Sequence, residues 1–190
     1  IARLWGFDRV PVTMPCAAAE PPAESKKGVV ERRIRDFLSG CGYAEVINYS
    51  FISPLSADRL GLPEKDGRRN WVKIANPLSE DQSVLRTTIL WSLVETWRRN
   101  AYAGAGDLKI YEIGKVFFRR GDGELPMERN RVGALIAGVR YEEGWGFGGA
   151  QADFFDLKGA VEGLLDALRY AGPEYRSDFR EPFQIGRAHV

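Results

Sequence analysis

Three glycines, Gly144, Gly146 and Gly149, form a GxGxxG pattern between a predicted strand and a predicted helix. Such a pattern binds the pyrophosphate of a dinucleotide when the helix begins directly at the glycines. Here the helix is expected to begin several residues later, and the strand before the glycines is expected to belong to an antiparallel pair. We therefore expect no dinucleotide site in this stretch.

The ionisable side chains form no catalytic or metal-binding constellation either. His189 is the only histidine and lies one residue from the end of the sequence, so we expect neither a histidine-dependent triad nor a two-histidine metal site. Asp153 and Asp156 stand at the predicted start of a helix, where carboxylates stabilise the positive end of the helix dipole. We interpret them in that way, and not as the close, apolar-embedded pair that acid–base catalysis requires. The residue pattern thus predicts no catalytic, cofactor-binding or metal site.

The composition narrows the class of protein. The 190 residues include 27 basic and 26 acidic side chains, a net charge of +1, which gives no overall field toward nucleic acid or an anionic membrane. No run approaches the roughly 18 apolar residues of a membrane span. Cys16 and Cys41 are too few for a disulfide framework and lie in no CxxC motif, so we interpret them as reduced thiols of a cytoplasmic protein.

The stretch from Lys73 to Asn100 is expected to organise the chain, because it joins a strand end, a rigid turn at Asn76-Pro77 and the most amphipathic helix. Ser79 and Gln82 have the spacing of a capping box. The apolar positions then follow the period of one helix face: Leu90, Leu93, Val94, Trp97 and Ala101.

Elements before this stretch are predicted from the same periodicities. A helix is expected where Val30, Ile34, Phe37, Leu38 and Cys41 share one face. A half-buried strand is expected over Glu45 to Phe51, where Ile47, Tyr49 and Phe51 alternate with smaller or polar residues. Ser53-Pro54 is typical of a helix start, and the polar stretch PEKDGRRN after Gly61 is expected to be an exposed loop.

The later part of the chain indicates an antiparallel strand pair and a last helix. Asp107 to Arg119 is strand-like but changes phase beside Gly114, which predicts a β-bulge. Its partner is the apolar run Val132 to Tyr141. The last helix is expected to begin at Asp153 and to bury Leu157, Val161, Leu164, Leu165 and Leu168. This order favours an α+β fold with a mostly antiparallel sheet flanked by helices.

Five segments resemble, in order, the core region of bacterial-type phenylalanyl-tRNA synthetase β subunits: IARLWGFDRVP, YAEVINYSFISP, IANPLSEDQSVLRTTILWSLVETWRRN, LKIYEIGKVF and DFFDLKGAVEGLL. The resemblance covers nearly the whole chain and implies a class II aminoacyl-tRNA synthetase-like fold. It divides the chain into the tail of a preceding small domain at 1–15, an Ala/Pro-rich linker at 16–25 and a core domain, truncated at its C-terminal end, at 26–190.

The resemblance also implies that this core does not catalyse. A class II site uses an arginine of its second motif to stabilise charge on the transferring phosphate. Phe118 stands at that position, and Arg119, one residue further, points to the opposite face of a strand. We expect no cofactor to bind this chain, whereas the whole enzyme uses ATP and Mg²⁺ to attach phenylalanine to its tRNA.

The same resemblance implies that the partner is the catalytic α subunit of an α2β2 assembly. It also implies that tRNA is bound by the whole enzyme. The residues expected at the subunit interface are Phe37, Tyr49, Phe51, Arg86 and Trp91. Two alternatives stay open at this point. One is a competent adenylating domain, and the other is an RNA-binding module in which Arg32, Arg33, Arg35, Arg98 and Arg99 converge in space.

Overall fold

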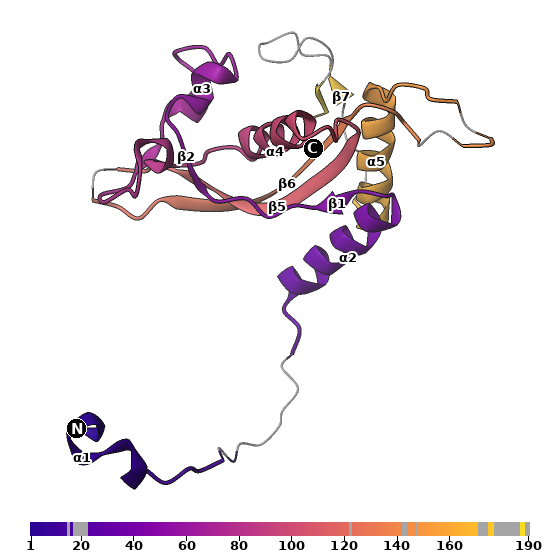
Figure 1. Cartoon of the computed structure of the whole chain (residues 1–190). Coiled ribbons are helices and arrows are strands. Elements are labelled where there is room, and N and C mark those ends of the chain that lie inside the picture. The colour runs from indigo at the N-terminus through magenta and orange to yellow at the C-terminus, as the bar shows by residue number, and fades with distance from the viewer. Residues whose placement is uncertain are drawn as a thin grey trace.

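The computed structural model describes residues 1–14, 16, 23–121, 123–141, 144–146, 148–170, 175–176 and 187–188 (Figure 1). His189 and most of the proposed linker at 16–25 lie outside the described residues. At the N-terminus, helix α1 (Ala2–Trp5) and the 3-10 turn η1 (Phe7–Arg9) form a short piece that lies apart from the sheet in Figure 1. Gly6 ends α1 with a φ of 95°, as expected for a helix-terminating glycine.

The core is built on one long hairpin. Strands β5 (Leu108–Phe118) and β6 (Met127–Ala137) are antiparallel, and the short β1 (Ala44–Glu45) adds to β5 in parallel. A second sheet of antiparallel pairs has the order β2 (Phe51–Ile52), β4 (Val84–Leu85), β3 (Val72–Lys73). Strands β7 (Tyr175–Arg176) and β8 (Arg187–Ala188) pair separately. The α+β prediction with a mostly antiparallel sheet is confirmed.

Helices cover both faces of this hairpin. Helices α2 (Lys26–Gly40) and α5 (Phe154–Ala167) pack on the face that carries Tyr111, and α4 (Leu90–Tyr102) packs on the face that carries Ile110 and Val116. Figure 1 shows α4 on one side of the strands and α2 on the other. The small helix α3 (Ser56–Arg59) and the turns η2 (Gly67–Arg69) and η3 (Glu80–Gln82) lie in the connection between β2 and α4.

The bulge predicted beside Gly114 is wrong. Residues of β5 pair one for one with β6, from Leu108 opposite Ala137 to Phe118 opposite Met127. The apolar pattern changes phase because the strand is buried on both faces, so neighbouring residues Ile110 and Tyr111 both carry core side chains.

The capping box predicted at Ser79 is also wrong. Ser79 precedes the 3-10 turn η3 and its side chain caps no backbone N–H. Strand β4 separates this turn from α4, and it is Thr88 that accepts a hydrogen bond from the backbone of Leu90, at 3.2 Å. The predicted period of α4 itself is confirmed.

The first turn of α5 agrees with the sequence interpretation. Asp153 accepts from the backbone N–H groups of Phe155 and Asp156, and Asp156 accepts from the backbone of Asp153, which makes a reciprocal capping box. Arg140 lies 2.7 Å from the Asp156 carboxylate. The hydrogen bond from the Asp153 backbone, reinforced by Arg140, lowers the pKa of Asp156. The two carboxylates therefore cap the N-terminus of α5.

The described part of the chain shows neither a membrane-spanning helix nor a metal-binding cluster. None of its helices has the length and apolar character needed to cross a membrane. The same residues contain no group of three or more histidine, cysteine or carboxylate side chains that could hold a metal ion.

Candidate docking surface and the degenerate class II site

A buried ion pair links the segment after β4 to strand β5 and, through a further hydrogen bond, to helix α4. Arg86, just after β4, lies 2.6 Å from the Glu112 carboxylate of β5, and their side chains are 2% and 3% exposed. Arg86 also donates to the Lys115 carbonyl at 3.0 Å and to the Ser92 hydroxyl of α4 at 3.2 Å. Since a buried charge is costly without such partners, the pair fixes β4, β5 and α4 relative to one another.

Gly114 makes room for this ion pair. A Cβ at this position would overlap Arg86 Nη2 and would stand 3.0 Å from the Glu112 carboxylate. The glycine that suggested a bulge from sequence is therefore needed for the close approach of the guanidinium.

The second oxygen of Glu112 holds Asn48. Asn48 Nδ2 donates to Glu112 Oε2 at 2.9 Å, and Thr96 of α4 donates to Asn48 Oδ1 at 2.9 Å. The Asn48 amide is thus hydrogen-bonded at both its ends, between the central strand and α4. Sequence reasoning missed this network. One signal for it was present, because a glutamate inside the apolar run of β5 requires a buried partner.

The structure corrects the strand predicted over Glu45 to Phe51. Only its two ends are strands, in β1 and β2, and the alternation is inverted relative to the expectation. Ile47, Tyr49 and Phe51 are 92%, 77% and 46% exposed, and they are called the exposed row below. The residues that alternate with them are only partly exposed: Val46, Asn48 and Ser50.

Two hollows adjoin the exposed row. One, of about 290 Å³, includes Lys27 of α2, Ile47 and Asn48 in its lining. The other, of about 360 Å³, is lined by Tyr49 and Phe51 on one side and by α3, η3 and α4 on the other.

Three arginines and two carboxylates line the second hollow: Arg59, Arg98, Arg99, Asp81 and Glu95. The Arg59 guanidinium stands 5.8 Å from the centre of the Trp91 ring. Arg98 and Arg99 both pair with Glu95, at 2.7 and 3.1 Å. The hydrogen bond from Arg98, followed by that from Arg99, outweighs partial burial and lowers the pKa of Glu95.

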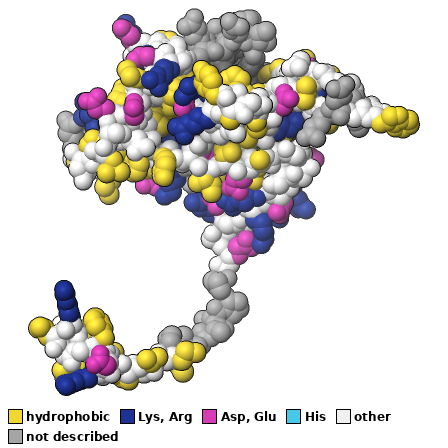
Figure 2. Space-filling view, in the orientation of Figure 1, with side chains coloured by type: hydrophobic (Ala, Val, Ile, Leu, Met, Phe, Trp, Pro, Cys, Tyr) yellow, Lys and Arg dark blue, Asp and Glu magenta, His cyan; other side chains and the backbone are white. Residues whose placement is uncertain are grey.

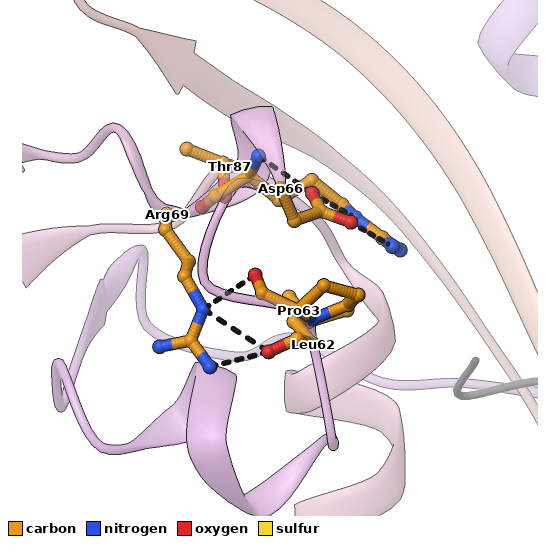
Figure 3. Close-up of polar contacts among 6 residues, drawn as sticks. Leu62, Pro63, Asp66, Arg69 and Thr87 are labelled. Atoms are coloured by element: carbon orange, nitrogen blue, oxygen red, sulfur yellow. Dashed lines mark hydrogen bonds and ion pairs between the residues drawn. The ribbon is translucent and has the colours of Figure 1, made fainter. Parts of the chain in front are cut away.

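The loop between α3 and β3 is held by hydrogen bonds of its own arginines, which its polar composition did not indicate. Figure 3 shows Arg69 directed at the carbonyls of Leu62 and Pro63, with an Arg69 Nε distance of 2.9 Å to Pro63. The Thr87 hydroxyl donates to the Arg68 carbonyl at 2.6 Å. The loop is therefore attached to the chain segment that carries Arg86.

The degenerate motif position lies at the end of β5. Phe118 packs against the cluster under α4, and the Arg129 guanidinium of β6 stands 5.6 Å from its ring centre. Further along the same face α4 approaches the sheet closely, since a Cβ on Gly133 would stand 3.0 Å from Leu93 and 3.3 Å from Ile89. On this face side chains of α4 fill the space above the hairpin.

The structure separates the five residues predicted for a subunit interface. Tyr49 and Phe51 belong to the exposed row, whereas Trp91 is half-buried under Arg59. Phe37 is half-buried against α5, and Arg86 is buried in its ion pair. Their participation in a subunit contact stays a prediction. The buried Arg86 would contribute only by positioning its neighbours.

The arginines invoked for RNA binding do not converge. Arg32, Arg33 and Arg35 belong to α2, and Arg98 and Arg99 belong to α4, on opposite faces of the hairpin. The space-filling view in Figure 2 also shows acidic and basic side chains interspersed over α2. Two of its arginines pair with acidic residues: Arg32 with Glu24 and Arg35 with Glu31 and Glu45.

This fold is that of a class II aminoacyl-tRNA synthetase core. Two solved structures of pyrrolysyl-tRNA synthetase from Desulfitobacterium hafniense superpose with TM-scores of 0.58 and 0.59. Each comparison covers 80% of this chain, and they cover 49% and 50% of the synthetase chains at 16% and 17% sequence identity. At this identity the likeness concerns the fold alone.

The family follows from closer matches. Residues 10–189 match the family described as phenylalanyl tRNA synthetase beta chain CLM domain, and the chain belongs to this family. It is 46% identical over 183 residues to the phenylalanine–tRNA ligase beta subunit of Syntrophus aciditrophicus (strain SB) and 41% identical over 183 residues to that of Geobacter sulfurreducens. Both matches cover 96% of this chain and 23% of the relative, so the chain spans about a quarter of their length.

Proposed function

We propose that this chain is the catalytically silent core of a phenylalanine–tRNA ligase β subunit and acts as a scaffold for the catalytic α subunit. The observation that carries the proposal is the replacement of the second-motif arginine by Phe118. An apolar ring that packs under α4 offers no charge to a transferring phosphate.

The surroundings of Phe118 support this view. Arg129 of the neighbouring strand β6 stands 5.6 Å from the centre of the Phe118 ring. The face of the hairpin that α4 covers is filled by Ile89 and Leu93 close to Gly133. These contacts support the proposal that ATP and Mg²⁺ serve the whole enzyme at its α subunit and do not bind beside Phe118.

The partner is proposed from the family. A β subunit has at least one other subunit, and we propose a catalytic α subunit in an α2β2 assembly that attaches phenylalanine to tRNA in the cytoplasm. The exposed row supports a protein contact, because a surface of large apolar side chains is typical of interface cores.

Isothermal titration tests the silent site. The β subunit, purified without its partner and shown to be folded by circular dichroism, is titrated with ATP and Mg²⁺ and then with a stable analogue of phenylalanyl-adenylate. We expect no heat of binding, whereas the two-subunit enzyme, as a positive control, should bind both. Micromolar binding to the isolated β subunit would overturn the proposal and favour a competent adenylating domain.

A matched variant addresses the motif position directly. Phe118→Leu keeps an apolar side chain at the end of β5, so the aminoacylation rate of the two-subunit enzyme should stay within about twofold of wild type. A much larger loss of rate without loss of assembly would mean that Phe118 takes part in the chemistry.

A further inference from the structure

The exposed row is held outward against the usual preference of apolar side chains. In an extended segment, a shift by one residue exchanges the two faces, so it would turn Ile47, Tyr49 and Phe51 inward and Asn48 outward. The inward positions of the segment are instead taken by Val46 and by the polar residues Asn48 and Ser50. Something other than apolar burial therefore determines which face is exposed.

Hydrogen bonds made by Val46, Asn48 and Ser50 hold the segment in this orientation. The backbone N–H of Val46 donates to the Tyr111 carbonyl at 2.8 Å, and the Ser50 carbonyl accepts from the Arg86 backbone at 2.9 Å. Between them, the Asn48 side chain is bonded to Glu112 and to Thr96. A one-residue shift would remove Asn48 from a carboxylate that is 3% exposed and would leave that oxygen without its donor.

We propose that Asn48 is a positioning residue, held by Glu112 and Thr96, which keeps Ile47, Tyr49 and Phe51 outward as a preformed docking row for the catalytic α subunit. The inference rests on the proposed function and adds the residues that prepare the contact. A row that is ordered before binding avoids the entropic cost of ordering on association.

The surroundings of the row indicate the chemistry of the surface that meets it. The two hollows that adjoin the row can receive side chains of a partner, so we expect the partner to combine an apolar depression for the row with side chains that project into the hollows. The larger hollow is lined by Arg59, Arg98 and Arg99 against the two carboxylates Asp81 and Glu95. We therefore expect the segment of the α subunit that enters this hollow to carry a carboxylate.

The first experiment locates the contact. Full-length β subunit is titrated with the catalytic α subunit, and the dissociation constant is measured by fluorescence anisotropy for wild type, Tyr49→Ala and Tyr170→Ala. Tyr170 is a matched control, because it is 54% exposed but follows α5, on the opposite face of the hairpin from α4. We expect roughly 30-fold weaker binding for Tyr49→Ala, as for an interface hot spot, and less than about threefold for Tyr170→Ala.

The outcomes of this experiment are distinguishable. Failure of the wild-type subunits to bind each other would overturn the proposed function itself. Binding that is equally insensitive to both tyrosine substitutions would leave the scaffold function standing and overturn the docking row.

A second experiment separates positioning from stability in a double-variant cycle. Asn48→Ala is expected to weaken binding about tenfold in the wild-type background but less than about twofold in the Tyr49→Ala background, because its effect on binding passes through the row. The change in melting temperature should be the same in both backgrounds. Equal losses of affinity in the two backgrounds would show a merely structural role and overturn the proposal.

Thr96→Val serves as the second variant if Asn48→Ala does not fold. It keeps the branched shape of the side chain and removes only the hydroxyl, which lies 2.9 Å from Asn48 Oδ1 and 2.9 Å from the Ser92 carbonyl of its own helix. We expect a smaller loss of affinity with the same dependence on Tyr49. Affinity that is independent of Tyr49 in this variant would contradict the positioning role.

Discussion

Replacement of Arg86 by methionine tests the role assigned to the buried ion pair. The change removes the charge that lies 2.6 Å from Glu112 while both side chains are almost fully buried. It also removes the donors to Lys115 and Ser92. The Glu112 carboxylate then keeps the hydrogen bond from Asn48 but has lost its cation.

The expected loss follows from the cost of an uncompensated buried charge. Breaking a buried pair by removing one member costs about 3–5 kcal/mol. The free energy of unfolding of a whole domain is only about 5–15 kcal/mol, so Arg86→Met should remove a large part of it. For a chain of this size each kcal/mol corresponds to about 2–4 °C, which predicts a melting temperature lower by roughly 6–20 °C.

Urea unfolding followed by circular dichroism measures this loss, and two control variants show its origin. Arg86→Met with Glu112→Gln removes both charges and keeps an amide that can accept from Asn48, so it should recover at least half of the lost stability. Lys115→Met breaks the exposed pair with Glu128, whose side chains are 50% and 47% exposed, and should cost less than about 1 kcal/mol. If Arg86→Met costs no more than Lys115→Met, the reasoning about the buried pair is refuted.

Three further predictions concern stability. Gly138→Ala should destabilise by at least about 2 kcal/mol in urea unfolding, because Gly138 has a φ of 81° and a Cβ would overlap Asp107; an unchanged midpoint would contradict this. Asp153→Ala should cost about 1 kcal/mol through loss of the α5 cap, as measured by thermal unfolding against Asp153→Asn, which retains a capping oxygen. The hydrogen bond from Arg98 lowers the pKa of Glu95 below its ordinary value of 4.5, so the stability from this pair is present above pH 4.5 and lost as pH falls through the lowered pKa. Between neutral pH and pH 3, Glu95→Gln should therefore lose less stability than wild type, and parallel acid profiles would argue against the pair.

The three long helices were predictable because their patterns are local, whereas the helix start expected at Ser53-Pro54 is wrong, since α3 begins at Ser56 after Leu55. The faces of α2, α4 and α5 follow a period of 3.6 residues that can be read without knowing what covers them. The Asp153 cap of α5 was predictable for the same reason, since a cap depends on backbone groups within three residues.

The errors have a common cause in contacts between distant parts of the sequence. The phase change at Gly114 indicated a bulge because a one-sided strand was assumed, whereas α2 with α5 and α4 cover opposite faces of β5. The capping box expected at Ser79 failed because β4 intervenes before α4. Nothing within a few residues of either position indicates these packing partners.

The sequence by itself determined the family, the class of fold and the apolar side chain at position 118, since these depend on residue identities in order along the chain. Only the tertiary structure decided which face of the segment from Val46 to Phe51 is exposed. The pattern of period two favours burial of Ile47, Tyr49 and Phe51, whereas the structure exposes them. The selection is made by Glu112, 64 residues from Asn48, because its buried carboxylate requires the amide of Asn48 on the inner side.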